Sequence, residues 1–308
     1  MNHKELANSK NKERLAQGHR TCPGCAIPII VRTALASIKE DVVVVGATGC
    51  MEVTTTIYPF TSWNIPFMHN AFENASATIS GIETAYKILK KKGLIKNNIK
   101  FVVFGGDGGS YDIGLQSLSG AIERGHDFLY ICYDNEAYQN TGNQRSSASP
   151  KGSKTSTTPI GKTFGKYEYR KDLTKVIANH NIAYCAQASI AFLDDFTEKV
   201  KKAMTIKGPK FINVLSPCTR YWGIKQSHTI DVAKLAVETN FWPLYEVENG
   251  KKYTINYKQK KKPITEYLKT QQRFKHLFDV KNKKIIDDIQ DHIDEEYKYL
   301  LSLEQISR

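Results

Sequence analysis

The chain has 308 residues, 41% of them hydrophobic, which is enough for one large globular domain with an appendage. Lys and Arg number 44 against 31 Asp and Glu, a net charge of +13, and no apolar run reaches the roughly 18 residues of a membrane span. No segment resembles a secretory signal, so we expect the six cysteines to be free thiols in a reducing cytoplasm and not disulfides.

Residues 1–17 are rich in charged side chains and form a predicted basic N-terminal extension. The main domain then begins with TCPGCA, in which Cys22 and Cys25 have the C-x2-C spacing of a metal knuckle. The run VVVVG at 42–46 predicts a buried strand of a parallel sheet, and Cys50 follows it in GATGC. A cysteine in that position is expected at the carboxyl edge of the sheet.

Two further apolar runs, FVVF at 101–104 and FLYICY at 128–133, predict buried strands, and each is followed by a polar cluster. The first cluster is GGDGGSYDIG at 105–114, and the second is DNEAYQNTGNQ at 134–144. Because parallel strands present their carboxyl ends at one edge of a sheet, where α/β proteins bind ligands, we expect the two clusters to lie side by side.

The first cluster combines glycines with a single carboxylate. Gly106, Gly108 and Gly109 let the backbone turn tightly and approach a ligand closely. Asp107 stands among them with no Lys or Arg nearby, and this setting suits a hard cation such as Mg²⁺ better than a bare phosphate. The first cluster therefore predicts one ligand of a magnesium site.

The second cluster offers the further oxygen ligands that such a cation needs. Asn135 supplies an amide oxygen and Ala137 a backbone carbonyl, and the cation would neutralise a diphosphate held at a helix N-terminus. The alternative is a glycine turn beside an Asn-rich loop, with Asp107 as a helix cap. Both clusters follow buried strands, which favours a diphosphate–metal clamp without identifying the ligand. The Ser- and Thr-rich segment 145–162 is expected to be an active-site loop.

The remaining cysteines divide into two kinds. Cys218 lies in LSPCTRYWG, directly after the predicted strand at 211–215, whereas Cys132 and Cys185 lie inside apolar runs and are expected to be packing residues. A structural zinc is usually bound by two pairs of ligands, each pair close together in sequence. Two of the loop cysteines are isolated in sequence, and this dispersal favours an iron–sulfur cluster seated in a folded pocket. The candidate four-thiolate site, which zinc or such a cluster could fill, consists of Cys22, Cys25, Cys50 and Cys218.

After residue 240 the composition shifts to Lys, Tyr and Gln, and we interpret 241–308 as a C-terminal arm that packs on the core or on a sister subunit. No recognised nucleic-acid motif occurs, so the excess charge is expected on a solvated surface or in docking acidic, ferredoxin-like partners, and not in binding nucleic acid. An amphipathic helix near the end of the arm is predicted by apolar residues at helical spacing, namely Ile285, Ile286, Ile289, Ile293, Tyr297 and Leu300.

Residues 18–240 form the main domain, and their buried strands predict an α/β fold with a mostly parallel sheet flanked by helices. GDG at 106–108 followed by Asn135 resembles the thiamine-diphosphate motif. Longer pieces between about Gly18 and Gly223 resemble, in the same order, the β subunit of pyruvate:ferredoxin oxidoreductase, one of the 2-oxoacid:acceptor oxidoreductases, which implies a thiamine-diphosphate-binding fold. These pieces are GHRTCPGCAIPI, GATGCMEVTTTIYPFTSWNIPFMHNAFENASATISG, GGDGGSYDIG, DNEAYQNTGNQRSSASP, TTPIG and LSPCTRYWG.

The resemblance also implies roles for individual residues. The four-thiolate site would hold one [4Fe-4S] cluster, and Asp107, Asn135 and the backbone of Ala137 would hold Mg²⁺. Asn140 would lie near the reacting carbon as the catalytic residue. In the cysteine knuckle Ala26 replaces a Gly of several relatives, and at position 135 Asn replaces a Thr of some relatives, but the ligand atoms remain. The implied cofactor-binding residues are Thr48, Cys50, Gly106, Asp107, Gly108, Gly109, Asn135, Asn140 and Thr141.

The reaction that the resemblance implies is the thiamine-dependent oxidative decarboxylation of pyruvate with coenzyme A (CoA) to acetyl-CoA and CO2, with electrons leaving through the cluster. It also implies an α subunit carrying the Glu that activates the pyrimidine, γ and ferredoxin-like δ subunits, and ferredoxin or flavodoxin as acceptor. Glu52 is a weaker candidate for that Glu, because a lone Glu after a strand is more often a cap or an ion-pair partner. No C-x2-C-x2-C-x3-C-P run occurs in the chain, so further clusters are expected on another subunit.

Four alternatives remain open. The substrate could be another 2-oxoacid, such as a branched-chain one or 2-oxoglutarate. A non-oxidative thiamine decarboxylase or synthase would have the clamp but no need of four convergent cysteines. A basic zinc-binding, nucleic-acid-associated protein would explain the knuckle and the charge but not the clamp. A degenerate structural subunit would have no reason to retain Asp107 and Asn135.

Overall fold

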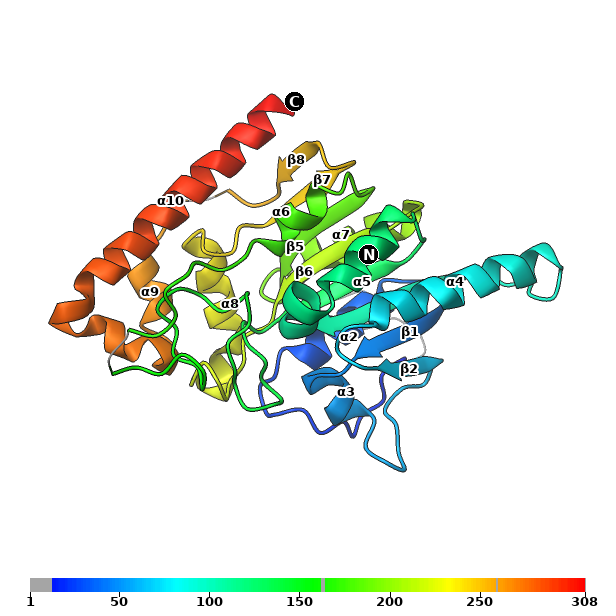
Figure 1. Cartoon of the computed structure of the whole chain (residues 1–308), viewed down its shortest axis with the longest axis horizontal. Helices are drawn as coiled ribbons and strands as arrows, with labels where there is room; N and C mark the ends of the chain where they lie inside the picture. Colours follow the sequence, from blue (N-terminus) through cyan, green and yellow to red (C-terminus); the bar gives the residue numbers. More distant parts are fainter. Residues whose placement is uncertain (1–12, 162–163, 259, 308) are drawn as a thin grey trace.

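The computed structural model describes residues 13–161, 164–258 and 260–307, which are arranged around one eight-stranded sheet (Figure 1). The strands follow one another across the sheet in the order β2-β1-β3-β4-β6-β5-β7-β8. Pairing is parallel from β2 to β5, and β7 and β8 are antiparallel. Their bounds are β1 Asp41–Ala47, β2 Phe67–Asn70, β3 Ile99–Gly106, β4 Leu129–Asp134, β5 Tyr184–Ser189, β6 Lys210–Leu215, β7 Tyr245–Glu248 and β8 Lys252–Ile255.

The central strands are buried along their whole length and are mostly apolar, because both faces of the sheet are covered. Every residue of β4, β5 and β6 is buried. Beside the strands, the chain forms π-helical or 3₁₀ turns η1 Gly108–Ile113, η2 Gln226–His228, η3 Gln272–Phe278 and η4 Val280–Asn282. The helices are α2 Ile27–Ala36, α3 Cys50–Thr55, α4 Ala75–Lys91, α5 Leu115–Glu123, α6 Leu173–Ala178, α7 Leu193–Thr205, α8 Thr229–Glu238, α9 Ile264–Leu268 and α10 Lys283–Ile306.

Two apolar layers hold these helices against the sheet. One layer packs α2 and α7 on one face, and the other packs α4, α5 and α6 on the opposite face. The predicted α/β fold with a mostly parallel sheet is therefore confirmed. None of the helices in the described ranges combines the length and the apolar character needed to cross a bilayer.

The C-terminal arm packs on the body of the same chain. Its strands β7 and β8 extend the sheet, and a third apolar cluster joins α8 to α9, η3 and α10. The predicted amphipathic helix is α10, which ends beside β8, while α4 projects from the opposite end of the molecule (Figure 1). Ile286, Ile289, Ile293 and Leu300 are buried, and Ile285 and Tyr297 are partly exposed.

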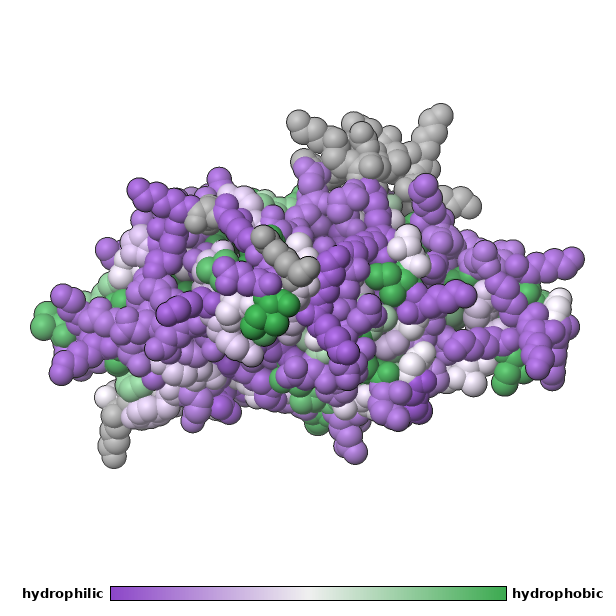
Figure 2. Space-filling model, turned by 90° about the horizontal axis from the view of Figure 1, so that it is seen from above, coloured by the Kyte–Doolittle hydropathy of each residue, from purple (hydrophilic) through white to green (hydrophobic). Residues whose placement is uncertain are grey.

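The predicted N-terminal extension is only partly described, because residues 1–12 lie outside the described residues. Leu15 is buried and pairs with Trp63, so the described end of that segment belongs to the core. The surface in Figure 2 is mostly hydrophilic, with hydrophobic side chains in small separate areas. That face therefore offers no continuous apolar surface.

Candidate functional site

The loops that follow β1, β3 and β4 meet at one edge of the sheet, because these strands are parallel neighbours. The loops line a small pocket of about 290 Å³, which we call the cofactor pocket. All nine residues predicted to bind the cofactor belong to its lining, which consists of Thr48, Gly49, Cys50, Phe72, Gly106, Asp107, Gly108, Gly109, Tyr133, Asn135, Ala137, Tyr138, Gln139, Asn140 and Thr141.

Two glycines explain why the loops approach so closely. A side chain at Gly108 would overlap the ring of Tyr138, whose hydroxyl donates a hydrogen bond of 2.9 Å to the Gly108 carbonyl. A side chain at Gly109 would come 3.0 Å from the carbonyl oxygen of Phe72. Glycine at these two positions lets the segments after β2 and β4 close on the loop after β3.

The three predicted magnesium ligands lie together. One terminal atom of the Asn135 amide lies 2.8 Å from the carbonyl oxygen of Ala137 and 2.9 Å from Oδ1 of Asp107. Hydrogen bonding favours the amide nitrogen in this position, from which it donates to both oxygen atoms; turning the amide by 180° would place its oxygen there instead. Asp107 also accepts hydrogen bonds from the backbone N–H of Asn135 at 3.1 Å and from the hydroxyl of Ser146 at 2.5 Å. These bonds fix the direction of the carboxylate.

With the amide turned so that its oxygen faces these two atoms, the spacing fits a magnesium ion. Adjacent oxygen ligands of an octahedral Mg²⁺, with bonds of about 2.0–2.1 Å, are separated by about 2.9 Å. Burial raises the pKa of Asp107 well above its ordinary value, and the neighbouring Asp134 raises it further. A divalent cation beside this carboxylate would favour the ionised form. The residues therefore suit a bound cation better than an empty pocket.

A buried polar network holds the end of β4 beneath the cofactor pocket. Asp134 accepts a hydrogen bond of 2.5 Å from the hydroxyl of Tyr111 and forms an ion pair of 2.6 Å with Arg170. Its other oxygen accepts the backbone N–H of Glu136 at 3.0 Å. Arg170 also approaches the carboxylate of Glu136, at 3.5 Å. The predicted ligand loop is thus anchored by two fully buried carboxylates and a guanidinium whose side chain is 17% exposed.

Asn140 and Thr141 lie at the rim of the cofactor pocket, where both are exposed. The Thr141 hydroxyl donates a hydrogen bond of 2.6 Å to the side-chain oxygen of Gln144, and the Gln144 amide returns one of 2.9 Å to the Thr141 carbonyl. These bonds stiffen the rim. The Asn140 amide is therefore accessible to a substrate that enters the pocket.

The second candidate acid, Glu52, points elsewhere. Its carboxylate accepts a hydrogen bond of 2.7 Å from Thr56 and lies 3.4 Å from the ring of His69. His69 in turn contacts the hydroxyl of Thr48 at 2.8 Å. Glu52 is therefore an ion-pair and hydrogen-bond partner, and among the described residues that line the cofactor pocket the only carboxylate is that of Asp107.

The four loop cysteines come to the same side of the fold. The knuckle is bound to the chain around Cys218, because Thr219 donates a hydrogen bond of 3.2 Å to the carbonyl of Pro23 and Thr229 donates one of 2.7 Å to that of Gly24. Cys218 accepts the backbone N–H of Tyr221 at its sulfur, at 3.4 Å. Cys50 belongs both to this group and to the lining of the cofactor pocket.

The thiols influence one another electrostatically. Burial raises the pKa of Cys25 to about 12, and Cys218 and Cys22 raise it further. Burial also raises the pKa of Cys50, and the other three thiols raise it further. Within the described ranges, however, no three His, Cys, Asp or Glu side chains are close enough to hold one metal ion. Cys132 and Cys185 are fully buried in β4 and β5.

Several residues at this site were not found from the sequence. Ser146 lies in the segment expected to be an active-site loop, but its hydrogen bond to Asp107 has no local pattern. Tyr138 was part of a quoted motif without an assigned role, although it packs on Gly108. No local sequence pattern indicates the role of Arg170, because its partner Asp134 is 36 residues away.

Comparisons with known proteins place the chain among thiamine-dependent enzymes. Residues 47–214 match the family model of the thiamine pyrophosphate enzyme C-terminal binding domain. The chain is 48% identical to pyruvate synthase subunit PorB of Thermotoga maritima, over 100% of this chain and 98% of that protein. It is 42% identical to ketoisovalerate oxidoreductase subunit VorB of Pyrococcus abyssi, over 96% of this chain and 94% of that protein. A solved 2-oxoglutarate:ferredoxin oxidoreductase from Magnetococcus marinus has a TM-score of 0.58 and 25% identity, covering 71% of each chain.

Proposed function

The chain belongs to the family of pyruvate synthase PorB subunits, and from that premise we propose that it is the β subunit of a pyruvate:ferredoxin oxidoreductase. The complex would convert pyruvate and CoA to acetyl-CoA and CO2, with ferredoxin or flavodoxin as the electron acceptor. The observation that carries the proposal is the convergence of Asp107, Asn135 and Ala137 in a pocket within the matched thiamine pyrophosphate domain.

Mg²⁺ would be held by the side chains of Asp107 and Asn135 and by the carbonyl of Ala137. Gly108 and Gly109 leave room for a diphosphate to approach the backbone. When bound, thiamine diphosphate supplies a carbanion and an electron sink. Asn140, exposed at the rim, is placed to hydrogen-bond a 2-oxoacid or its product. Tyr138 and Phe72 line the pocket and contact each other edge to face, with ring centres 5.8 Å apart.

The four thiols favour an iron–sulfur cluster over a single zinc ion. A zinc ion requires its ligands within bonding distance of one point, whereas each cysteine of a [4Fe-4S] cluster binds a different iron atom, so the sulfurs lie farther apart. The thiols lie near enough to raise the pKa of Cys50, and among the described residues no three His, Cys, Asp or Glu side chains form a site for a single ion. Because Cys50 lines the cofactor pocket, a cluster held by these thiols would lie beside the reacting centre. This supports an oxidative reaction over the non-oxidative alternative.

Partner subunits complete the proposal. The cofactor pocket contains no second carboxylate among its described lining, so the acid that activates the pyrimidine would come from an α subunit. The γ and ferredoxin-like δ subunits would carry the electrons onward, and the net charge of +13 would favour acidic partners. Thiolate ligands need reduced cysteines, and all six are free, so the proposal includes a cytoplasmic location.

A branched-chain 2-oxoacid is the second candidate substrate. The relative named ketoisovalerate oxidoreductase subunit VorB is 42% identical over 96% of this chain, the same identity as that of PorB from Pyrococcus furiosus. The β subunit alone therefore does not separate the two acids. The substrate pocket is expected to be shared with the α subunit.

The test is anaerobic purification of the chain with its co-expressed partners. Iron and thiamine diphosphate are measured, followed by CoA-dependent viologen reduction with pyruvate, 2-oxoisovalerate and 2-oxoglutarate. We expect both cofactors to be present and pyruvate to be the best substrate. A complex that contains zinc without iron, or that releases CO2 without reducing viologen, would contradict the proposal.

A further inference from the structure

One segment of the C-terminal arm lies between the two predicted cofactor loops. We call residues 134–138, which carry the predicted magnesium ligands, the metal loop, and residues 216–224, which contain Cys218, the Cys218 loop. The backbone N–H of Gln272 donates a hydrogen bond of 2.8 Å to the carbonyl of Trp222 in the Cys218 loop. Arg273 follows, and it is only 2% exposed.

On one side, Arg273 binds the metal loop. Its guanidinium forms an ion pair with the carboxylate of Glu136, which is completely buried. Glu136 stands between the predicted ligands Asn135 and Ala137 and has a φ of 65°, a left-handed conformation that is uncommon for a glutamate. This conformation brings the Asn135 amide and the Ala137 carbonyl to the same side, so the group that anchors Glu136 also fixes the predicted ligands.

On the other side, Arg273 packs on the Cys218 loop. Its guanidinium lies 4.0 Å from the ring centre of Trp222 and 5.4 Å from that of Tyr221. The Trp222 indole donates a hydrogen bond of 3.0 Å to the carbonyl of Asn135, which ties the two loops directly. Tyr221 donates its backbone N–H to the sulfur of Cys218. Arg273 thus contacts the neighbours of both sets of predicted ligands.

The charge of Arg273 reaches the thiol site as well. Burial raises the pKa of Cys218, and the positive charge of Arg273 acts in the opposite direction. For Arg273 itself, burial lowers the pKa, but the Glu136 carboxylate outweighs burial, so the guanidinium remains charged. A permanent positive charge near a cluster stabilises its reduced, more negative state.

We propose that Arg273 is a positioning residue that holds the metal loop and the Cys218 loop together and places a fixed positive charge between the cofactor pocket and the thiol site. The inference rests on the proposed function. Its consequence is that one side chain, far from either set of ligands in sequence, affects both thiamine diphosphate binding and the midpoint potential of the cluster.

The experiment compares three variants of the purified complex. Arg273→Gln removes the charge, Arg273→Lys keeps the charge but loses the planar guanidinium that stacks and pairs, and Arg170→Gln is the matched control. Arg170 is suitable because it pairs with Asp134 and Glu136 of the same metal loop. The dissociation constant of thiamine diphosphate in the presence of Mg²⁺ is measured by calorimetry, and the cluster potential by redox titration with EPR detection.

For Arg273→Gln we expect thiamine diphosphate to bind roughly ten- to hundredfold more weakly, as is usual when a residue that orients metal ligands is lost, and the potential to become more negative. Arg273→Lys should show the weaker binding with a nearly unchanged potential. Arg170→Gln should also weaken binding without the shift in potential. The pattern separates the positioning effect from the charge effect.

Two results would overturn the inference. One is a folded Arg273→Gln complex in which either the affinity or the potential is that of the wild type. The other is an Arg170→Gln complex whose potential falls as far as that of Arg273→Gln. If Arg273→Gln does not assemble, wild-type affinity in Arg273→Lys overturns the inference instead. A wild-type complex without thiamine diphosphate or iron would overturn the proposed function, and the inference with it.

Discussion

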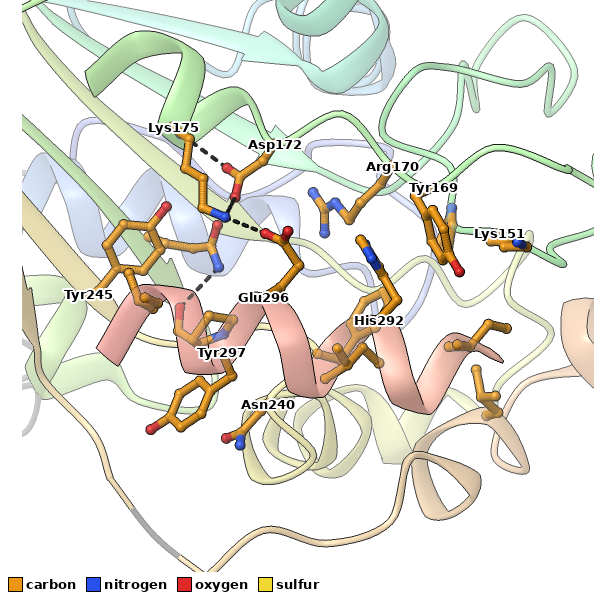
Figure 3. A pocket seen from close by; sticks show the side chains of 18 residues that line it. Lys151, Tyr169, Arg170, Asp172, Lys175, Asn240, Tyr245, His292, Glu296 and Tyr297 are labelled. Carbon is orange, nitrogen blue, oxygen red and sulfur yellow. Dashed lines mark hydrogen bonds and ion pairs between the residues drawn. The ribbon is translucent and has the colours of Figure 1, made fainter. Parts of the chain in front are cut away.

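Two cavities of this protein differ in a way that identifies the functional one. The larger, about 880 Å³, lies between α10 and the body of the chain, and we call it the arm groove (Figure 3). Its charged groups are paired: Lys175 with Asp172 and Glu296, and Arg170 with Asp134. The smaller cofactor pocket is about 290 Å³, and it brings together the Asp107 carboxylate, the Asn135 amide and the Ala137 carbonyl with no side-chain cation among its described lining residues.

The difference shows that unbalanced polar groups, and not volume, mark the site. In the arm groove, Tyr169 stacks on His292 with ring centres 3.6 Å apart, and apolar residues of α10 such as Ile293 and Leu300 line the wall. Such a lining is what two packed elements leave between them. In the cofactor pocket, Asp107 has a raised pKa that a cation would relieve. We therefore interpret the groove as a packing seam and expect the ligand in the cofactor pocket.

The largest effect is expected at Asp107. The Asp107→Ala change removes the only carboxylate among the described residues that line the cofactor pocket. Thiamine diphosphate with Mg²⁺ should then bind at least about a hundredfold more weakly, because loss of a residue that merely orients a metal ligand already weakens metal binding by up to that factor. Calorimetric titration measures the affinity, and iron content should remain that of the wild type. Normal affinity in Asp107→Ala would mean that the pocket is not the diphosphate site.

The next effect separates the two cofactors. The Cys218→Ala change should cause loss of most of the iron and of the EPR signal, while thiamine diphosphate affinity changes less, because Cys218 does not line the cofactor pocket. Cys185→Ala is the matched control, since Cys185 is fully buried in β5 away from the thiol group. Full iron and full electron transfer in Cys218→Ala would show that Cys218 is not a ligand.

The parts of the fold and the site that could be predicted from the sequence are those that depend on residues close together in the chain. The apolar runs at 42–46, 101–104, 128–133 and 211–215 fall within β1, β3, β4 and β6 or extend one residue beyond them, because strands buried on both faces must be continuously apolar. The pocket followed from the position of two polar clusters after neighbouring strands. Both inferences need only residues that are close in the chain.

Features that depend on distant partners were not predicted. The edge strand β2 has no fully buried residue and therefore no apolar run. Strands β7 and β8 have four residues each, too few for a clear alternation of apolar and polar side chains. Ser146 reaches Asp107 across 39 residues, and Arg273 reaches Glu136 across 137. No composition or spacing distinguishes these side chains from their solvated neighbours, because only the fold brings the partners together.

A smaller effect tests the interpretation of the arm groove. Leu300 lines it and is 2% exposed, so Leu300→Ala should lower the free energy of unfolding by about 2–5 kcal/mol, as cavity-forming core substitutions do. Thiamine diphosphate affinity should not change. Ile306→Ala, at a position 83% exposed near the end of the same helix, should alter stability by less than about 0.5 kcal/mol. A change in cofactor affinity in Leu300→Ala would mean that the groove is coupled to the site.

The smallest effect concerns Lys166, a buried lysine that hydrogen-bonds the carbonyl of Tyr169 in the wall of the arm groove. Its ammonium donates hydrogen bonds to the carbonyls of Ser149 at 2.5 Å, Ser147 at 3.3 Å and Tyr169 at 3.4 Å. Burial lowers the pKa of Lys166 to about 8, and Arg145 and Arg170 lower it further. Between pH 8 and the ordinary value of about 10.4, the unfolded chain therefore binds more protons at this residue than the folded chain does.

The contribution of Lys166 to the free energy of unfolding must then increase with pH in that window, by at most about 1.4 kcal/mol per pH unit. The Lys166→Met variant lacks this pH-dependent contribution. The carbonyls that it leaves without a hydrogen bond lower its free energy of unfolding by the same amount at every pH. The stability of the wild type minus that of the variant should therefore rise from pH 8 to pH 10.4 in urea unfolding followed by tryptophan fluorescence. Parallel pH profiles would show that Lys166 titrates as it does in water, and that the carbonyls of Ser147, Ser149 and Tyr169 do not surround a buried ammonium.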